Sequence, residues 1–507
     1  MGSRLKTRPL AASGCTAQTP RRARFHKIIQ KAEGITEPKL MPNAALPNSF
    51  IDSLVKILGR ENVLTDPYDL DRYSGDALSP SRAFGAEDSF ERLADVVARP
   101  GSTEDVSAVL KLANESGAPV IPYGGGTGVM GAVVPVMGGI VLDLQRMNEI
   151  LAINPTDMTA EVEAGVILED LESALALQGL MPGHDPYSVP IATVAGTIST
   201  NGVGYRAGAH GPMGDQVVAL EAVLADGRVM STRAVPNQSS GPSLKHLFIG
   251  SEGVFGVITK ATIRVFRMPE ARVFAGVAFD TFHQGFNAAA EMFALGVRPT
   301  LVDLTEEDDG VTFHLLFEGF KEGVQANEKR ALAVCAQFGG RMLGPDPTMA
   351  YWEDRRQSAE KYKVSALGKP RSVRWSRWRG RRGFDYLHLG LPISRVLEYR
   401  RRCDVIMAKS GVRVIEYAIW SRPELFSMLI VPEGGTATAS KDRLGETVQQ
   451  VLELAQDMGG VMEYCHGVGV KLNHLLAREM GVGQDVVQAL KQALDPNNIM
   501  NPGKLGL

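Results

Sequence analysis

The sequence has few cysteines, almost no net charge and no apolar run long enough to span a membrane. Its four cysteines, Cys15, Cys335, Cys403 and Cys465, form no C-x-x-C pair, which argues against an iron–sulfur site and a disulfide framework. Dispersed cysteines fit a reducing compartment, so we expect a cytoplasmic protein. A formal net charge of −3 gives no electrostatic reason to bind nucleic acid or an anionic membrane. With 507 residues, the chain is long enough for two or three domains.

The first thirty residues contain no acidic residue and no apolar core of a secretory signal. Their basic residues are Arg4, Lys6, Arg8, Arg21, Arg22, Arg24 and Lys27. This composition is compatible with a transit peptide, with a disordered extension, or with translation that starts at Met41. We expect residues 1–45 to form a basic, disordered extension. Organelle targeting and peripheral membrane association stay open.

A glycine-rich loop, Gly124–Gly128, follows the apolar segment that starts at Val120. Successive glycines leave backbone N–H groups unshielded, which favours a phosphate-binding nest. The loop lacks the Lys-Ser or Lys-Thr of an ATP-binding loop, since Val129 and Met130 stand there. It also lacks the helix that follows a dinucleotide fingerprint. The alternative is a tight hairpin turn without a ligand.

Four further motifs stand in a fixed order around this loop. The first predicts a turn and an amphipathic helix capped by Ser102 or Thr103, and the last predicts a Gly-Ser-Glu-Gly corner before a strand. The four segments are Ala98–Gly117, Pro190–Gly204, Met213–Gly227 and Leu247–Arg264. Together with the loop they resemble the FAD-binding domain of the FAD-linked oxidase superfamily, of the vanillyl-alcohol oxidase and p-cresol methylhydroxylase type. The resemblance runs from about Arg92 to the C-terminus and is strongest to glycolate oxidase large subunits, D-lactate dehydrogenases and alkyldihydroxyacetonephosphate synthases.

The resemblance implies an α+β fold in three parts. We expect a two-subdomain FAD-binding domain of the p-cresol methylhydroxylase type over residues 46–270. A cap domain with an antiparallel sheet is expected over 271–458, where it covers the flavin and forms the substrate pocket. Residues 459–507 are expected to return to the FAD-binding domain.

The resemblance also implies where FAD binds. The glycine loop would hold the pyrophosphate, residues 187–193 and 199–203 would line the flavin and its ribityl chain, and residues 252–258 would follow the adenosine side. The predicted FAD-binding residues are Pro122, Gly124, Gly125, Gly126, Thr127, Gly128, Ser188, Pro190, Thr193, Gly196, Ser199, Thr200, Asn201, Glu252, Gly253, Gly256 and Ile258. For Thr197, Ser199 and Thr200 the alternative is a solvated strand face. No histidine or cysteine lies between Pro122 and Met130, so we expect non-covalent FAD, and a covalent link from the cap stays open as the alternative.

His466 is the first candidate for proton transfer. It lies in Glu463–Gly469, which resembles the family's H-G-x-G corner, whose histidine lies beside the isoalloxazine ring. Imidazoles titrate near neutral pH, which suits proton transfer. The alternative is a buried histidine that fixes a tight turn. Relatives that oxidise 2-hydroxy acids have a glutamate directly before this histidine and the synthases have a run of histidines, whereas Tyr464 and Cys465 precede it here.

Three secondary candidates come from the cap. Tyr386 and His388 lie where relatives bring a strand to the substrate side of the flavin. Arg355 belongs to Trp352–Arg356, which resembles a W-x-x-R element whose arginine binds a substrate carboxylate, a task that suits a bidentate guanidinium. The alternative for Arg355 is a surface ion pair on a helix.

Two other segments bear on function. The region Glu416–Glu424 has no histidine where metal-assisted relatives carry their ligands, so we expect no catalytic metal. The segment Arg371–Arg382 interleaves arginines with Trp375 and Trp378. We interpret it as a mobile cap loop with solvated charge. A phosphate-bearing substrate, a membrane face, an acidic partner or nucleic acid are the alternatives.

The leading hypothesis is an FAD-dependent oxidoreductase that oxidises an alcohol or 2-hydroxy acid by hydride transfer to flavin N5. The first alternative is a flavin-dependent transferase of the alkyldihydroxyacetonephosphate synthase kind. The second is a non-enzymatic flavin-fold binding protein. We expect a small-molecule substrate and no nucleic-acid partner. The electron acceptor (oxygen, a quinone or a redox protein) and a homodimer stay open.

Overall fold

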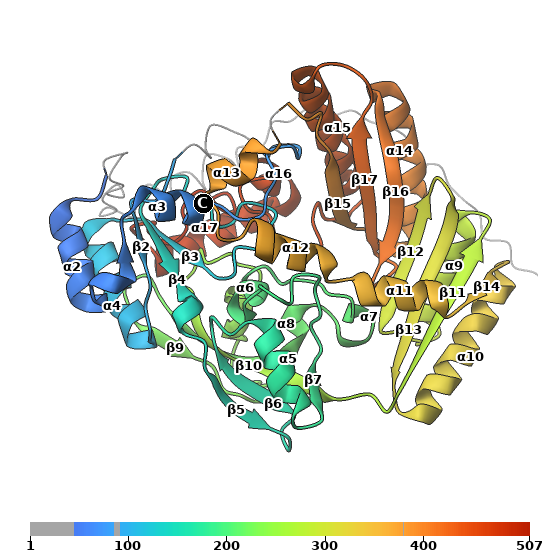
Figure 1. Cartoon of the computed structure of the whole chain (residues 1–507), viewed down its shortest axis with the longest axis horizontal. Helices are drawn as coiled ribbons and strands as arrows, with labels where there is room; N and C mark the ends of the chain where they lie inside the picture. The colour runs from blue at the N-terminus through green and yellow to red at the C-terminus, as the bar shows by residue number, and fades with distance from the viewer. Residues whose placement is uncertain (1–44, 86–91, 379) are drawn as a thin grey trace, which may run out of the picture. The chain divides into compact units, whose positions relative to one another are not determined.

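A computed structural model describes residues 45–85, 92–378 and 380–507 as three β-sheets with their helices (Figure 1). The predicted basic extension, 1–45, lies outside the described residues except for Ala45. The first two sheets come from residues 63–267 and the third from residues 271–432. The predicted α+β class is confirmed.

The first sheet has the strand order β1-β2-β4-β3, with β2, β4 and β3 parallel. Its strands are β1 (Val63–Leu64), β2 (Val96–Ala98), β3 (Val120–Tyr123) and β4 (Ile140–Asp143), and helices α2 (Asn48–Leu58) and α3 (Pro67–Tyr73) flank β1. Parallel strands require a crossover, which helix α4 (Thr103–Ser116) provides between β2 and β3. Ser102 caps α4 by accepting a hydrogen bond from the Asp105 N–H at 3.1 Å, as the motif predicts.

The second sheet is antiparallel, and its long strand β10 (Val257–Arg267) pairs with three others. The remaining strands are β5 (Ile150–Asn154), β6 (Thr159–Glu163), β7 (Leu180–Pro182), β8 (Val217–Val223) and β9 (Val229–Ser231). The helices are α5 (Leu168–Ala176), α6 (Val194–Ser199), α7 (Ala207–His210) and α8 (Met213–Gln216). The strand alternative for Thr197 and Ser199 is wrong, because the Thr193 hydroxyl caps α6 by accepting from the Gly196 N–H at 3.3 Å.

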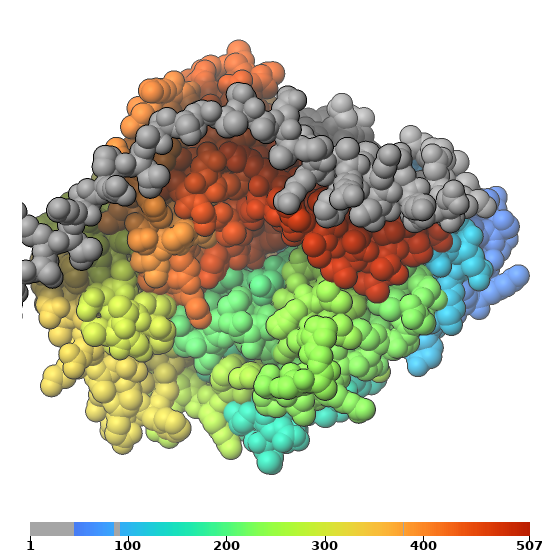
Figure 2. Space-filling model, turned by 180° about the vertical axis from the view of Figure 1, so that it is seen from behind, coloured from blue at the N-terminus to red at the C-terminus, as the bar shows by residue number. Residues whose placement is uncertain are grey.

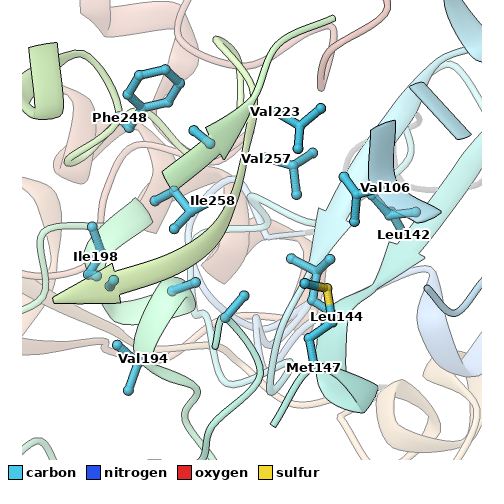
Figure 3. Close-up of a cluster of buried hydrophobic side chains, with 14 of the residues drawn as sticks. Val106, Leu142, Leu144, Met147, Val194, Ile198, Val223, Phe248, Val257 and Ile258 are labelled. Atoms are coloured by element: carbon cyan, nitrogen blue, oxygen red, sulfur yellow. The ribbon is translucent and has the colours of Figure 1, made fainter. Parts of the chain in front are cut away.

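One apolar core joins the first two sheets (Figure 3). Val106 of α4 and Leu142 of β4 belong to the same buried cluster as Val223 of β8 and Val257 of β10. Full burial of such a side chain contributes about 1.5–3 kcal/mol. The core therefore fixes the two sheets to each other, and with them the glycine loop after β3 and the corner before β10.

The third sheet is antiparallel, with the order β14-β11-β13-β12-β16-β17-β15. Its strands are β11 (Ala271–Phe279), β12 (Leu301–Glu307), β13 (Gly310–Gly319), β14 (Arg341–Gly344), β15 (Asp385–Gly390), β16 (Val412–Trp420) and β17 (Leu425–Pro432). Four helices cover its apolar face, α9 (Phe282–Ala294), α10 (Lys321–Gln337), α14 (Val396–Ser410) and α15 (Ala437–Asp457) (Figure 1). Strand side chains alternate between faces, so Tyr386, His388 and Glu416 lie on the opposite face.

Helices α11 (Asp346–Asp354), α12 (Gln357–Ser365) and α13 (Arg371–Ser376) connect β14 to β15. Arg371 and Arg374 of α13 are only 5% exposed. Arg374 donates to the Asp76 carbonyl at 3.1 Å and Arg371 to the Ser74 carbonyl at 2.9 Å. The interpretation as solvated charge is therefore wrong for these two arginines, because backbone carbonyls bind them.

No helix among the described residues combines the length and apolarity that crossing a membrane requires.

The C-terminal residues extend the first sheet. After helices α16 (Asn473–Met480) and α17 (Val482–Leu494), Met500 forms an isolated parallel bridge with Val120 of β3. The Val120 N–H donates to the Ile499 carbonyl at 2.7 Å, and the Asn501 N–H donates to the Val120 carbonyl at 2.8 Å. In Figure 2 the red C-terminal atoms adjoin the green and blue atoms of the first two sheets. The tail thus supports the strand that leads into the glycine loop.

Replacing Asp495 by alanine should loosen this tail. The buried Lys491 ammonium lies 2.6 Å from the Asp495 carboxylate, which also accepts the Ile499 and Met500 N–H groups. Removing one partner of a buried pair leaves the other charge uncompensated, so the free energy of unfolding should fall by about 3–5 kcal/mol in a urea titration. Asp457→Ala, which removes an exposed pair with Arg478, is the control and should cost no more than about 1 kcal/mol. Equal losses would contradict the prediction.

Candidate FAD and active site

A cavity lies among the glycine loop, helix α6 and the turn that carries His466. The loop must be glycine because the chain passes close to its neighbours. A Cβ on Gly125 would lie 2.3 Å from the Ile191 carbonyl oxygen, and one on Gly124 would lie 2.4 Å from Thr193 Oγ1. The glycines therefore let the loop approach the start of α6, and no side chain shields the N–H groups of the loop itself.

The predicted FAD-binding residues line this cavity, with the exception of Pro190 and Asn201. Pro190 is buried beside the cavity residues without lining it. The Asn201 side chain instead accepts the Gly214 N–H at 2.9 Å. The structure thus gathers three segments that lie far apart in the sequence, and their contact with FAD stays a prediction.

Two buried carboxyl groups belong to the same wall. Burial raises the pKa of Asp76 to about 6 and the pKa of Glu252 to about 7. Asp76 accepts the Gly131 N–H at 2.9 Å, and Glu252 accepts the N–H groups of Val468 and Gly469. A carboxyl group that is partly protonated or bonded to N–H donors can lie near a diphosphate without strong repulsion. Asp76 lies outside every motif, so no sequence feature pointed to it.

The turn that carries His466 is built around Glu463. The Glu463 carboxylate accepts the N–H groups of Tyr464, Cys465 and His466 at 3.2, 2.8 and 3.0 Å. The same Oε1 lies 3.3 Å from His466 Nδ1. Burial alone would raise the pKa of Glu463, but the charge of His466 and the hydrogen bonds lower it to about 2. The carboxylate thus fixes the backbone of the turn that presents His466, with Oε1 within ion-pair distance of the imidazole.

Beside His466 the cap contributes a cluster of rings. The ring centres of His388 and His466 are 4.8 Å apart, and those of Tyr386 and His388 are 4.4 Å apart. Burial lowers the pKa of His388 to about 3, which keeps it neutral. The Tyr386 hydroxyl donates to Glu416 at 2.5 Å, and burial raises the pKa of Glu416 to about 7. The three predicted residues lie together, although Trp420 and His466, not Tyr386 or His388, line the cavity.

Arg355 lies in an ion-pair network rather than at the cavity wall. Its guanidinium is 3.2 Å from Asp185 and stacks on Trp352 at 3.9 Å. Arg206 and Arg356 bind the same carboxylate at 2.9 and 2.6 Å. In this structure Arg355 therefore binds a carboxylate of the protein itself. The ion pair is buried and does not lie on the surface.

Sequence reasoning missed His184, which lines the cavity. It stands three residues before the predicted flavin segment that begins at Tyr187, in the run Gly183-His-Asp-Pro. That proximity is the signal that could have found it. Within the described ranges, no group of three or more His, Cys, Asp or Glu side chains is placed to hold a metal ion.

Gly125→Ala should weaken FAD binding. Its new Cβ would lie 2.3 Å from backbone, so the loop must shift away from the start of α6. We expect the purified variant to lose most of its flavin absorbance after gel filtration. Gly323→Ala, on the exposed side of α10 with no atom within 4 Å, is the control and should keep it. Full retention by Gly125→Ala would contradict the assignment of the loop.

Non-covalent attachment predicts that acid precipitation releases the flavin into the supernatant. Yellow pigment in the washed pellet would contradict it.

Comparison with solved structures identifies the fold. The chain superimposes on p-cresol methylhydroxylase with substrate bound at a TM-score of 0.72 and 20% identity, over 92% of this chain and 98% of the other. An alkyldihydroxyacetonephosphate synthase gives a TM-score of 0.70 at 19% identity, over 95% and 92% of the two chains. At these identities the likeness concerns the fold.

Sequence comparison identifies the family. D-lactate dehydrogenase of Archaeoglobus fulgidus is 34% identical over 90% of this chain and 99% of its own length. A glycolate oxidase subunit of Bacillus subtilis is 27% identical over 83% and 91%. An alkyldihydroxyacetonephosphate synthase of Trypanosoma brucei brucei is 25% identical over 94% and 84%. Residues 94–233 match the FAD binding domain and residues 268–505 match the C-terminal domain of FAD linked oxidases. The chain therefore belongs to the FAD-linked oxidase family, and its cofactor is FAD.

Proposed function

We propose that this FAD-linked oxidoreductase oxidises the CH–OH group of an alcohol or a 2-hydroxy acid. The observation that carries the proposal is the His466 imidazole, which lines the cofactor cavity with its Nδ1 3.3 Å from the Glu463 carboxylate. The names of the D-lactate dehydrogenase and glycolate oxidase relatives support a small 2-hydroxy acid as the first substrate to test. Membership of an oxidoreductase family sets aside the non-enzymatic alternative.

The bound FAD supplies an acceptor for the hydride that leaves the substrate carbon. His466 would accept the hydroxyl proton, and Glu463 would orient the imidazole and stabilise its protonated form. His388 stays neutral because of burial and packs its ring against His466. It would keep water and charge away from that side of the imidazole. Tyr386, whose hydroxyl donates to Glu416, packs against His388 and would hold that ring in place.

A second candidate is a flavin-dependent transferase of the alkyldihydroxyacetonephosphate synthase kind. It is favoured by the 25% identity to the Trypanosoma brucei brucei enzyme over 94% of this chain. Such a reaction involves no net oxidation. A transferase would form product without an external electron acceptor, and its flavin would return to the resting spectrum. The first candidate reaction would instead leave the flavin reduced until an acceptor reoxidises it.

His466→Gln should slow substrate oxidation by about 10²- to 10⁴-fold, the usual contribution of a positioned acid or base. The measurement is anaerobic stopped-flow mixing of the holoenzyme with D-lactate, glycolate and simple alcohols, followed by loss of the flavin absorbance. His283→Gln, an exposed histidine of α9, is the matched control and should react as the wild type. If no alcohol or hydroxy acid bleaches the wild-type flavin, the proposed oxidation is wrong.

Glu463→Gln tests positioning. Loss of the carboxylate that accepts the N–H groups of the turn should misplace the imidazole and lower kcat, with FAD still bound and KM little changed. The measurement is kcat and KM between pH 5 and 9, a window in which the pKa of about 2 keeps Glu463 ionised in the wild type. An unchanged kcat in a variant that retains FAD would contradict the positioning role.

A further inference from the structure

His184 is a buried polar side chain without a partner. It is 3% exposed, it lines the cofactor cavity, and neither Nδ1 nor Nε2 has a hydrogen-bond partner among the described residues. A buried group left unbonded typically costs about 1–3 kcal/mol, so native proteins rarely keep one unless a ligand or water completes it. The reaction proposed above assigns His184 no role.

The position of His184 shows which part of the cavity it faces. A Cβ on Gly202 would lie 3.4 Å from its Cε1 and Nε2 atoms. The next residue, Val203, packs in one buried cluster with Cys465, and Trp420 packs against that cluster. Trp420, Cys465 and His466 line the cavity as well. His184 thus belongs to the end of the cavity where the His466 turn enters, whereas the glycine loop forms the anion-binding part.

The state of the imidazole limits what it can bind. Burial lowers the pKa of His184 to about 4, so at neutral pH the ring is uncharged and offers one N–H donor and one nitrogen acceptor. An apolar edge would leave both nitrogens unbonded, so the ligand edge that it faces must be polar. An edge that carries both carbonyl and N–H groups suits either nitrogen of the neutral ring.

We propose that His184 forms a hydrogen bond with the polar, carbonyl-bearing edge of the flavin ring of bound FAD and thereby sets the affinity and reduction potential of the cofactor. Asp185, the next residue, is held by Arg206, Arg355 and Arg356, which keeps this backbone in place. His184 is thus a cofactor-contacting residue contributed by the FAD-binding domain, whereas His466 reaches the same cavity from the C-terminal segment. The proposal depends on FAD binding and not on the identity of the substrate.

The test compares three substitutions of His184 in the purified holoenzyme. His184→Leu removes both nitrogens. His184→Asn places an amide near the position of Nδ1, and His184→Gln places one near the position of Nε2. Three readouts need no substrate: the FAD dissociation constant from the rise of flavin fluorescence on dilution, the visible absorption spectrum, and the reduction potential from dye equilibration. His314→Leu is the control, because His314 is half-buried on β13, bonded to Thr348, and outside the cavity lining.

We expect His184→Leu to bind FAD about tenfold more weakly, with a shifted spectrum and potential, as loss of one hydrogen bond to a buried group implies. One of the two amide variants should keep FAD affinity, spectrum and potential close to those of the wild type. The control His314→Leu should also behave as the wild type. Should His184→Leu fail to fold, unequal FAD affinity and potential of the Asn and Gln variants carry the proposal.

Two results would overturn it. One is a folded His184→Leu variant with unchanged FAD affinity, spectrum and potential, or three substitutions that change these properties equally. The other is a changed KM for a reactive substrate with all flavin properties intact, which would assign the hydrogen bond to the substrate instead. Absence of any reactive substrate would sink the proposed oxidation but leave this test unaffected.

Discussion

The contact on which the site depends is the one between Glu252 and the backbone after His466. Its carboxyl group accepts the N–H groups of Val468 and Gly469, although 216 and 217 residues separate them in the chain. Gly467 must lack a side chain there, because a Cβ would lie 2.3 Å from Glu252 Oε1. One buried carboxyl group thus ties the corner before β10, which lines the cofactor cavity, to the turn that presents the imidazole.

Local sequence rules predicted the parts of the fold that short-range chemistry determines. The cap of α4 by Ser102 and the glycine loop after β3 follow from hydrogen bonding and steric limits within a few residues. The segment around Thr193 was harder, since alternating small residues fit both a strand and a short helix, and the threonine cap decides for the helix. The resemblance to FAD-linked oxidases supplied the order of these parts in space.

The sequence could not predict properties that depend on distant partners. Arg355 carries a guanidinium suited to a carboxylate, but the carboxylate beside it is Asp185, 170 residues earlier. The prediction of solvated charge at Arg371 and Arg374 was wrong for the same reason, because the carbonyls of residues 72–76 that bind them come close only in the folded chain. The unbonded state of His184 is likewise a result of packing, and no motif encodes it.

The Asp185 cluster has a consequence for how the enzyme admits its substrate. Arg206 comes from the FAD-binding part, whereas Arg355 and Arg356 come from the connection between α11 and α12, so three guanidinium groups from two regions share one carboxylate that is fully buried. Moving the two regions apart would take Arg355 and Arg356 away from that carboxylate and leave Arg206 as its remaining guanidinium partner, which costs free energy because the charge is buried. The cluster therefore opposes a hinge motion between these two regions when substrate enters.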